Sequence, residues 1–123
     1  MILGAVLLLI GGSDPVQPCR PERFEDISDI EACIRQTAVN LIWVSSRTCR
    51  IHDRVKRADR LDGRWDRIVS DYLGFTGEKN LELEIRLVDP GRCNQPDSFT
   101  RWAGIVDRDL IRMRRWLDDK GKH

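Results

Sequence analysis

Four cysteines limit what this chain can fold into more than any other feature. Cys19, Cys33, Cys49 and Cys93 are spread over a chain of 123 residues. In a small exported protein an even number of cysteines is typical of a disulfide framework, whereas in a reducing compartment the same residues are thiols or metal ligands. The cysteines therefore predict two disulfides, provided that the chain is exported.

The N-terminal residues 1–13 have the pattern of a secretory signal peptide. An apolar run over 2–10 precedes Gly11, Gly12 and Ser13, and small residues after an apolar core are what a signal peptidase requires. No lysine or arginine precedes the run, so an uncleaved anchor is the alternative. At about 1.5 Å per residue, roughly eleven apolar residues are too short to cross a bilayer core of about 30 Å. We expect a periplasmic or secreted protein with no stable membrane span after processing.

The spacing of apolar residues predicts that most of the chain is helical. Apolar or small residues recur every three or four positions over 29–60, which predicts one long helix. Ser28 and Glu31 have the spacing of a capping box at its start. Ser45 and Ser46 are the weakest point of the pattern, and a kink or hairpin there is the alternative.

Three further segments follow this helix. A second helical face begins after Gly63 and is expected to end at Gly74, a typical C-terminal cap. The segment 80–88 alternates between apolar and charged residues, as strands do. Since no second segment offers a partner for its ladder groups, we expect a helix there and keep a short strand as the alternative. The last helix begins at Asp97 or Ser98, and its apolar stripe consists of Phe99, Trp102, Val106, Leu110, Met113 and Leu117.

Together these patterns predict an all-α fold, an irregular antiparallel bundle of about four helices with two disulfides. The helical domain is expected to occupy 28–119. An irregular, Pro-rich strap at 14–27 precedes it, and a polar tail at 120–123 follows it.

Helix geometry limits how the cysteines can pair. On one continuous helix Cys33 and Cys49 would lie about 24 Å apart, whereas a disulfide holds two Cα atoms about 5.5 Å apart. Of the two pairings that remain, we favour Cys19–Cys33 together with Cys49–Cys93. The first would hold the strap against the start of the long helix.

The sequence contains no set of residues typical of an enzyme. No serine lies in a nucleophile elbow, and no glycine-rich segment has the spacing of a phosphate loop. We therefore expect a protein without catalytic residues, cofactor or metal. The alternative is a cytosolic Cys/His zinc module, because His52 follows Cys49 by three residues and Cys33 and Cys93 could complete a ligand set.

Charge is distributed unevenly along a chain whose formal net charge is only +1. A nearly neutral total argues against a nucleic-acid partner. Arginines nevertheless recur at helical spacing in two groups, and arginine is well suited to carboxylate recognition. These candidate binding residues are Arg47, Arg50, Arg54 and Arg57 in the first group and Arg101, Arg108, Arg112 and Arg115 in the second.

The expected function is therefore that of a small exported, non-enzymatic interaction module whose basic helix faces bind an acidic envelope protein or polymer. The alternative without a binding role is that the arginines form solvent-exposed helix faces whose charge is balanced by the acidic segments. The segment 43–49 resembles part of the periplasmic lysozyme-inhibitor-like family, with Trp43 four residues before Arg47 and a cysteine after it. The likeness covers less than a tenth of the chain, and Cys49 follows Arg47 too closely for the family pattern. It supports only a second alternative, an inhibitor of an envelope hydrolase such as lysozyme.

Overall fold

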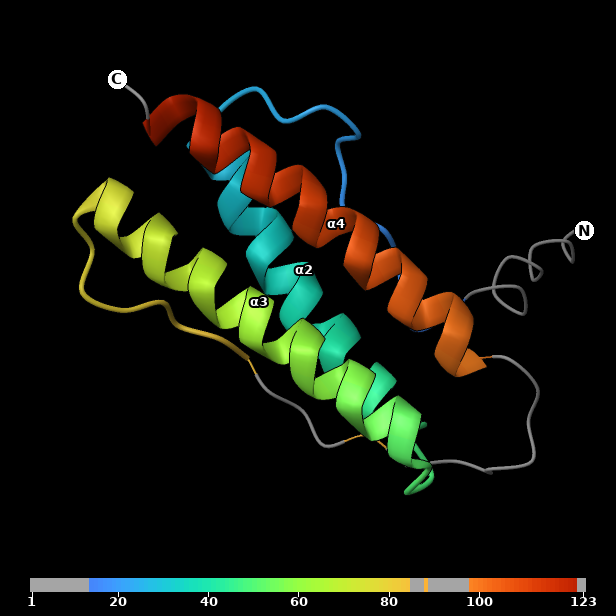
Figure 1. The fold of residues 1–123 in the computed structure, drawn as a ribbon. Coiled ribbons are helices and arrows are strands. Elements are labelled where there is room, and N and C mark those ends of the chain that lie inside the picture. Colours follow the sequence, from blue (N-terminus) through green and yellow to red (C-terminus); the bar gives the residue numbers. More distant parts are fainter. Residues whose placement is uncertain (1–13, 85–87, 89–97, 122–123) are drawn as a thin grey trace, which may run out of the picture.

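The computed structural model describes residues 14–84, 88 and 98–121, and these residues form three α-helices. They are α2 (Ile27–Ser45), α3 (His52–Thr76) and α4 (Ser98–Gly121). Each helix packs against the other two (Figure 1). The predicted all-α class is confirmed, although the described residues hold three helices where about four were expected.

The helices are not all antiparallel. Helix α2 runs against the other two, whereas α3 and α4 run in the same direction (Figure 1). Two ion pairs between α3 and α4 show this, since Arg64 pairs with Asp107 and Asp71 with Arg114, so that residue numbers rise together on both helices. The purely antiparallel bundle was a wrong prediction. The 77–97 connection has enough residues to link the end of α3 to the start of α4 at the other end of the bundle. A short loop would instead make neighbouring helices antiparallel.

The long helix predicted over 29–60 is interrupted by a turn. Ser46 closes α2, and its hydroxyl donates to the Trp43 carbonyl at 2.6 Å. Cys49 and Arg50 then have φ values of 52° and 61°, in the left-handed region that no α-helix uses. Local hydrogen bonding by serine competes with helix formation, and the alternative of a break at this point is confirmed.

Helix α3 in turn is longer than the sequence pattern suggested. It passes through Gly63 and Gly74 and ends at Thr76. Gly77 is its C-cap, with a φ of 79°, and donates its backbone N–H to the Leu73 carbonyl. A glycine inside a helix costs only about 1 kcal/mol relative to alanine. Burial of flanking residues such as Leu61 offsets that cost, so the predicted boundaries at Gly63 and Gly74 were wrong.

The start of α2 also differs from its prediction by two residues. Asp26, not Ser28, is the N-cap, and its carboxylate accepts from the backbone of Ser28 and Asp29. Asp29 completes the capping box in place of Glu31. Aspartate and serine are similarly favourable N-caps, so the sequence pattern was compatible with an N-cap at either Asp26 or Ser28.

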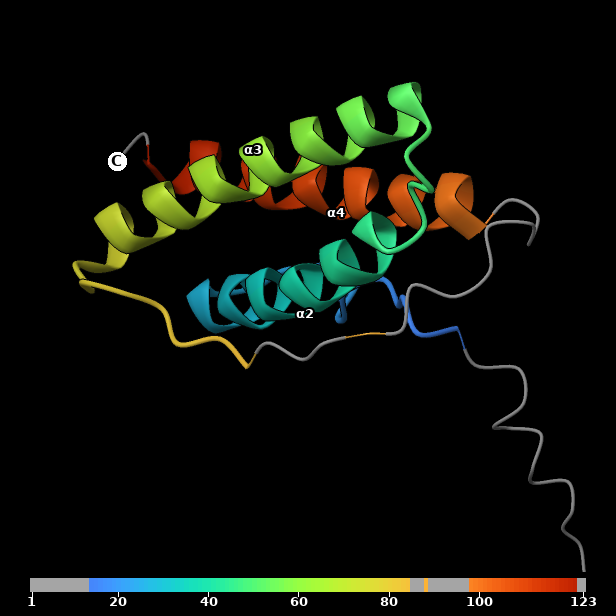
Figure 2. The same cartoon turned by 90° about the horizontal axis from the view of Figure 1, so that it is seen from below.

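Within the predicted 80–88 helix, residues 81–84 and 88 are neither helix nor strand. Leu81 packs against the core, and Arg35 of α2 donates to the Glu82 carbonyl. In Figure 2 the described residues after α3 lead to the first turns of α2, and residues 82–84 share a hollow with α2. Half-buried leucines alternate there with exposed glutamates, so the alternation marks an irregular segment that lies on a helix. The predicted helix was wrong for these residues, and 85–87 lie outside the described part.

The core is built around the apolar stripe of α4, which was predicted correctly. All six of its residues are buried, and they pack with apolar residues of α2, α3 and the strap in one cluster. None of the helices in the described ranges has the length and apolar character needed to cross a bilayer.

The strap at 14–27 is held to the bundle by a disulfide. Val16 and Cys19 are buried, and Cys19 is bonded to Cys33 with a Cα–Cα distance of 5.2 Å. This predicted pair is confirmed, although the helix used to exclude a Cys33–Cys49 pair is broken. Cys49 is not a free thiol. Its predicted partner Cys93 lies outside the described residues, as does the 1–13 segment, so both remain predictions.

Candidate binding surface

The first group of arginines does not form one helix face. Arg47 and Arg50 lie in the turn between α2 and α3, and only Arg54 and Arg57 belong to α3. The predicted stripe assumed a continuous helix, and it disappears with the break.

Two of these arginines are used to hold the turn in place. The Arg47 guanidinium lies 5.9 Å from the ring centroid of Trp43 and 5.2 Å from that of Trp102. Arg54 donates to the Arg47 carbonyl at 3.2 Å and lies 5.4 Å from the ring centroid of Phe99. Cations on aromatic faces stabilise the fold where they are partly desolvated. The side chains of Arg47 and Arg54 therefore stabilise the fold.

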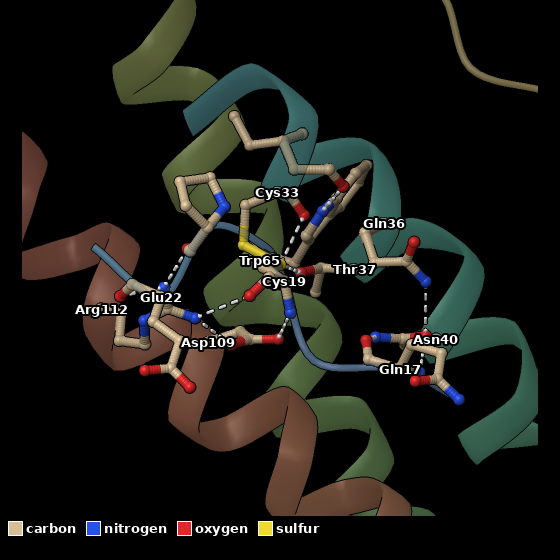
Figure 3. Close-up of a disulfide and its surroundings, with 12 residues drawn as sticks. Gln17, Cys19, Glu22, Cys33, Gln36, Thr37, Asn40, Trp65, Asp109 and Arg112 are labelled. Carbon is tan, nitrogen blue, oxygen red and sulfur yellow. Dashed lines mark hydrogen bonds and ion pairs between the residues drawn. A yellow bond between two sulfur atoms is a disulfide. The ribbon is translucent and has the colours of Figure 1, made fainter. Parts of the chain in front are cut away.

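Arg112, in the second group, fastens the strap to α4. Its guanidinium donates to the carbonyls of Cys19 and Pro21 at 3.3 and 2.7 Å, and also to that of Glu22 (Figure 3). It pairs with Asp109 at 2.8 Å. Asp109 is fully buried and accepts from the Cys19 backbone N–H at 2.9 Å. A buried carboxylate needs such partners, so Arg112 has a structural role.

A second polar anchor holds the strap on α2. Asn40 is fully buried, accepts from the backbone N–H of Gln17 at 3.3 Å and donates to the Gln17 carbonyl at 2.8 Å (Figure 3). Sequence analysis did not identify Asn40 or Asp109. The sequence signal for both was a polar residue at a position that the helical periodicity assigns to the core.

The other predicted arginines are more accessible. Arg101 pairs with Asp14 of the strap at 3.0 Å on the surface. Arg50, Arg108 and Arg115 are exposed, and none of the three pairs with an acidic residue in the described part of the chain.

Arg115 borders a groove between the parallel helices α3 and α4. The groove has a volume of about 350 Å³, and the described residues that line it all belong to these two helices. Its floor contains the buried Ile68 and Leu110, and Ile111 is 38% exposed beside them. Four arginines complete the lining: Arg64, Arg67, Arg114 and Arg115.

The four arginines of the groove differ in how they are neutralised. Arg64 pairs with Asp107. Arg114 pairs with Asp71 at 2.6 Å and with Asp118 at 3.1 Å. Within the described residues, no acidic side chain pairs with Arg67 on α3 or Arg115 on α4. The groove thus presents two unneutralised cations beside an apolar floor.

The same seam continues toward the C-terminal ends of both helices. A second hollow, of about 560 Å³, shares Arg114 with the first, and its lining within the described part of the chain again comes from α3 and α4. Phe75 is 48% exposed there, and its ring lies edge-on to Trp116 with centroids 6.1 Å apart. We call the two hollows together the α3–α4 groove.

The groove was only partly accessible to sequence analysis. Arg115 was among the predicted residues, but Arg64, Arg67 and Arg114 were not. The signal for the α3 residues was the three-residue step from Arg64 to Arg67.

One group of possible metal ligands occurs in the described residues. The ligand atoms of Cys19, Cys33 and Asp109 lie within 4.8 Å of one another. The two sulfurs are bonded to each other, and zinc requires free thiolates. In this oxidised form Cys33 is also not available to the zinc set predicted with Cys49 and His52.

Three acid–base groups of the bundle have shifted pKa values, and one of them, Tyr72, is buried. The Tyr72 hydroxyl donates to Glu31 across the α2–α3 contact. This hydrogen bond, followed by Arg35, holds the pKa of Glu31 below its usual value, while burial and then Glu31 raise the pKa of Tyr72. Burial, together with Asp59 and Asp66, raises the pKa of Asp62.

No protein-family model, curated protein or solved structure matches this chain.

Proposed function

We propose that this chain is an exported, non-enzymatic interaction protein that binds an acidic partner through the α3–α4 groove. The observation that carries the proposal is the pair of unneutralised arginines, Arg67 and Arg115, on the two helices that enclose an apolar floor. Arginine binds carboxylates through forked hydrogen bonds, and an apolar floor adds affinity through burial.

Four of the other predicted arginines are engaged within the fold, whereas Arg50 and Arg108 are exposed like Arg115. Arg47, Arg54 and Arg112 stack on rings or bond backbone carbonyls, and Arg101 is paired with Asp14. Arg67 and Arg115 are exposed and border a hollow that a partner can enter.

Export is supported by two features. The 1–13 segment has the order of a signal peptide, and the Cys19–Cys33 disulfide belongs to an oxidising compartment. The intact mass of protein from its native host tests this. A mature chain lacking the leader and four hydrogens supports export, whereas a full-length chain with four thiols contradicts it.

Binding is tested with poly-L-glutamate as the probe and the full disulfide-bonded chain. We expect the R67E/R115E variant to bind roughly tenfold more weakly than the wild type, since two attractive charges become repulsive. The wild-type affinity should fall as salt is raised.

A matched control keeps the same change of net charge but moves it away from the groove. Arg20 and Arg108 are exposed and line a separate hollow beside the strap. The R20E/R108E variant should bind poly-L-glutamate within about twofold of the wild type. Equal losses in both variants would show that net charge alone governs binding and would overturn the proposal.

A further inference from the structure

The shape of the α3–α4 groove indicates what kind of partner it takes. Its two hollows share Arg114 and follow the seam from Arg64 to Phe75 on α3. At about 1.5 Å per residue this stretch is roughly 16 Å long, about three helical turns. A straight, shallow seam between two helices is the position that another helix occupies in a four-helix bundle.

The rest of the bundle is covered differently. The strap bonds to both α2 and α4, through Asn40 and Asp109, and residues 82–84 lie against α2. Irregular chain therefore covers the α2 side, whereas among the described residues only those of α3 and α4 line the groove on the opposite side. Of the surfaces in the described part of the chain, this groove has the form in which a further helix can pack.

The chemistry of the groove defines two faces of its occupant. The floor offers Ile68, Leu110 and the partly exposed Ile111, with Phe75 further along. Apolar side chains at steps of three and four residues would lie over this floor. Arg67 stands on the α3 rim and Arg115 on the α4 rim of the first hollow, so acidic side chains are required there on both flanks of the apolar stripe. The acidic residues that line the second hollow, Asp71 and Asp118, are both paired with Arg114.

We infer that the partner inserts an amphipathic helix with acidic flanks into the α3–α4 groove, which completes a four-helix bundle. This inference rests on the proposed function and adds to it the conformation and polarity of the bound segment. A flexible polyanion would use Arg67 and Arg115 but leave the apolar floor open.

Three probes separate the inference from the proposed function. The first is a peptide of five helical turns with leucines at i, i+3, i+4 and i+7 and glutamates on both flanks. The second has the same composition in scrambled order, and the third is poly-L-glutamate. Binding is measured by the fluorescence of the full disulfide-bonded chain, in which Trp116 packs against Phe75 beside the groove, with calorimetry as a second readout.

We expect the amphipathic peptide to bind at least tenfold more tightly than the scrambled one and to gain helical circular dichroism when bound. Equal affinity for the two peptides overturns the inference and leaves the proposed function standing. Failure of all three probes to bind overturns both.

Variants of the floor and the rims give a second, independent measurement. Because Ile111 and Phe75 are partly exposed, I111S/F75A should fold and should lose at least tenfold in affinity for the amphipathic peptide while retaining affinity for poly-L-glutamate. R67E/R115E should lose both. A floor variant that binds the amphipathic peptide as tightly as the wild type overturns the inference.

Discussion

The two sides of α4 use the same residue type in opposite ways. On the strap side, Arg112 is 20% exposed, pairs with the buried Asp109 and bonds backbone carbonyls. On the groove side, Arg115 is exposed and has no acidic partner in the described residues. The two arginines are three positions apart, so helical spacing places them in one stripe. What separates them is the irregular segment that covers one side and not the other.

The largest expected effect breaks the strap side. Replacing Arg112→Ala leaves Asp109 buried without its counter-charge, which should lower the free energy of unfolding by roughly 3 to 5 kcal/mol. Arg115→Ala is the matched control and should change it by less than about 0.5 kcal/mol. Urea denaturation followed by circular dichroism measures both, and similar losses in the two variants would contradict the comparison.

The disulfide is the second support of the strap. The C19S/C33S double variant should lose about 3 kcal/mol of stability, because the crosslink no longer restricts the unfolded chain. This loss should lower the urea midpoint of unfolding. Since Arg112 and Asn40 still hold the strap, affinity of the folded variant for poly-L-glutamate should remain within about twofold. A large loss of affinity would show that strap and groove are coupled.

Asn40 tests the polar contact between strap and α2. Asn40→Ala removes two hydrogen bonds to the backbone of Gln17 and should cost about 1 to 2 kcal/mol. Gln36→Ala is a suitable control, because Gln36 bonds only to the Asn40 side chain among the described residues. Equal destabilisation by the two substitutions would argue against the backbone contact as the cause.

The smallest expected effect is a change in pH dependence. The pKa of Glu31 is lowered in the folded state, first by the Tyr72 hydroxyl and then by Arg35. A lowered folded-state pKa stabilises the fold at pH values above the ordinary glutamate pKa of 4.5. That stabilisation is lost as the pH falls through the folded-state pKa. Tyr72→Phe should make the decline of stability in acid shallower, as measured by thermal unfolding at a series of pH values. An unchanged slope would contradict the assigned cause.

The sequence predicted those parts of the fold that depend on local apolar spacing. The stripe of α4 was correct, since its period is uninterrupted from Phe99 to Leu117. The Cys19–Cys33 pair was also correct. Helix boundaries were less predictable, because Cys49 and Arg50 adopt positive φ values that their residue types do not indicate.

The candidate site was harder to predict than the fold. A list of arginines at helical spacing does not reveal which side of a helix another segment will cover. Arg112 became structural because the strap arrives from about ninety residues away in sequence. The parallel arrangement of α3 and α4, which creates the groove, likewise depends on a long return connection that leaves no periodic signal.

Under the proposed export, the strap also determines the order in which the fold can be completed. Cys19 and Cys33 are only 14 residues apart, so their bond can close soon after the first part of the chain emerges from a translocation channel. The contact between Cys19 and Asp109 spans 90 residues and must wait for the C-terminal helix. The strap would therefore be tethered to α2 before α4 is present, and α4 would then fix the strap through Asp109.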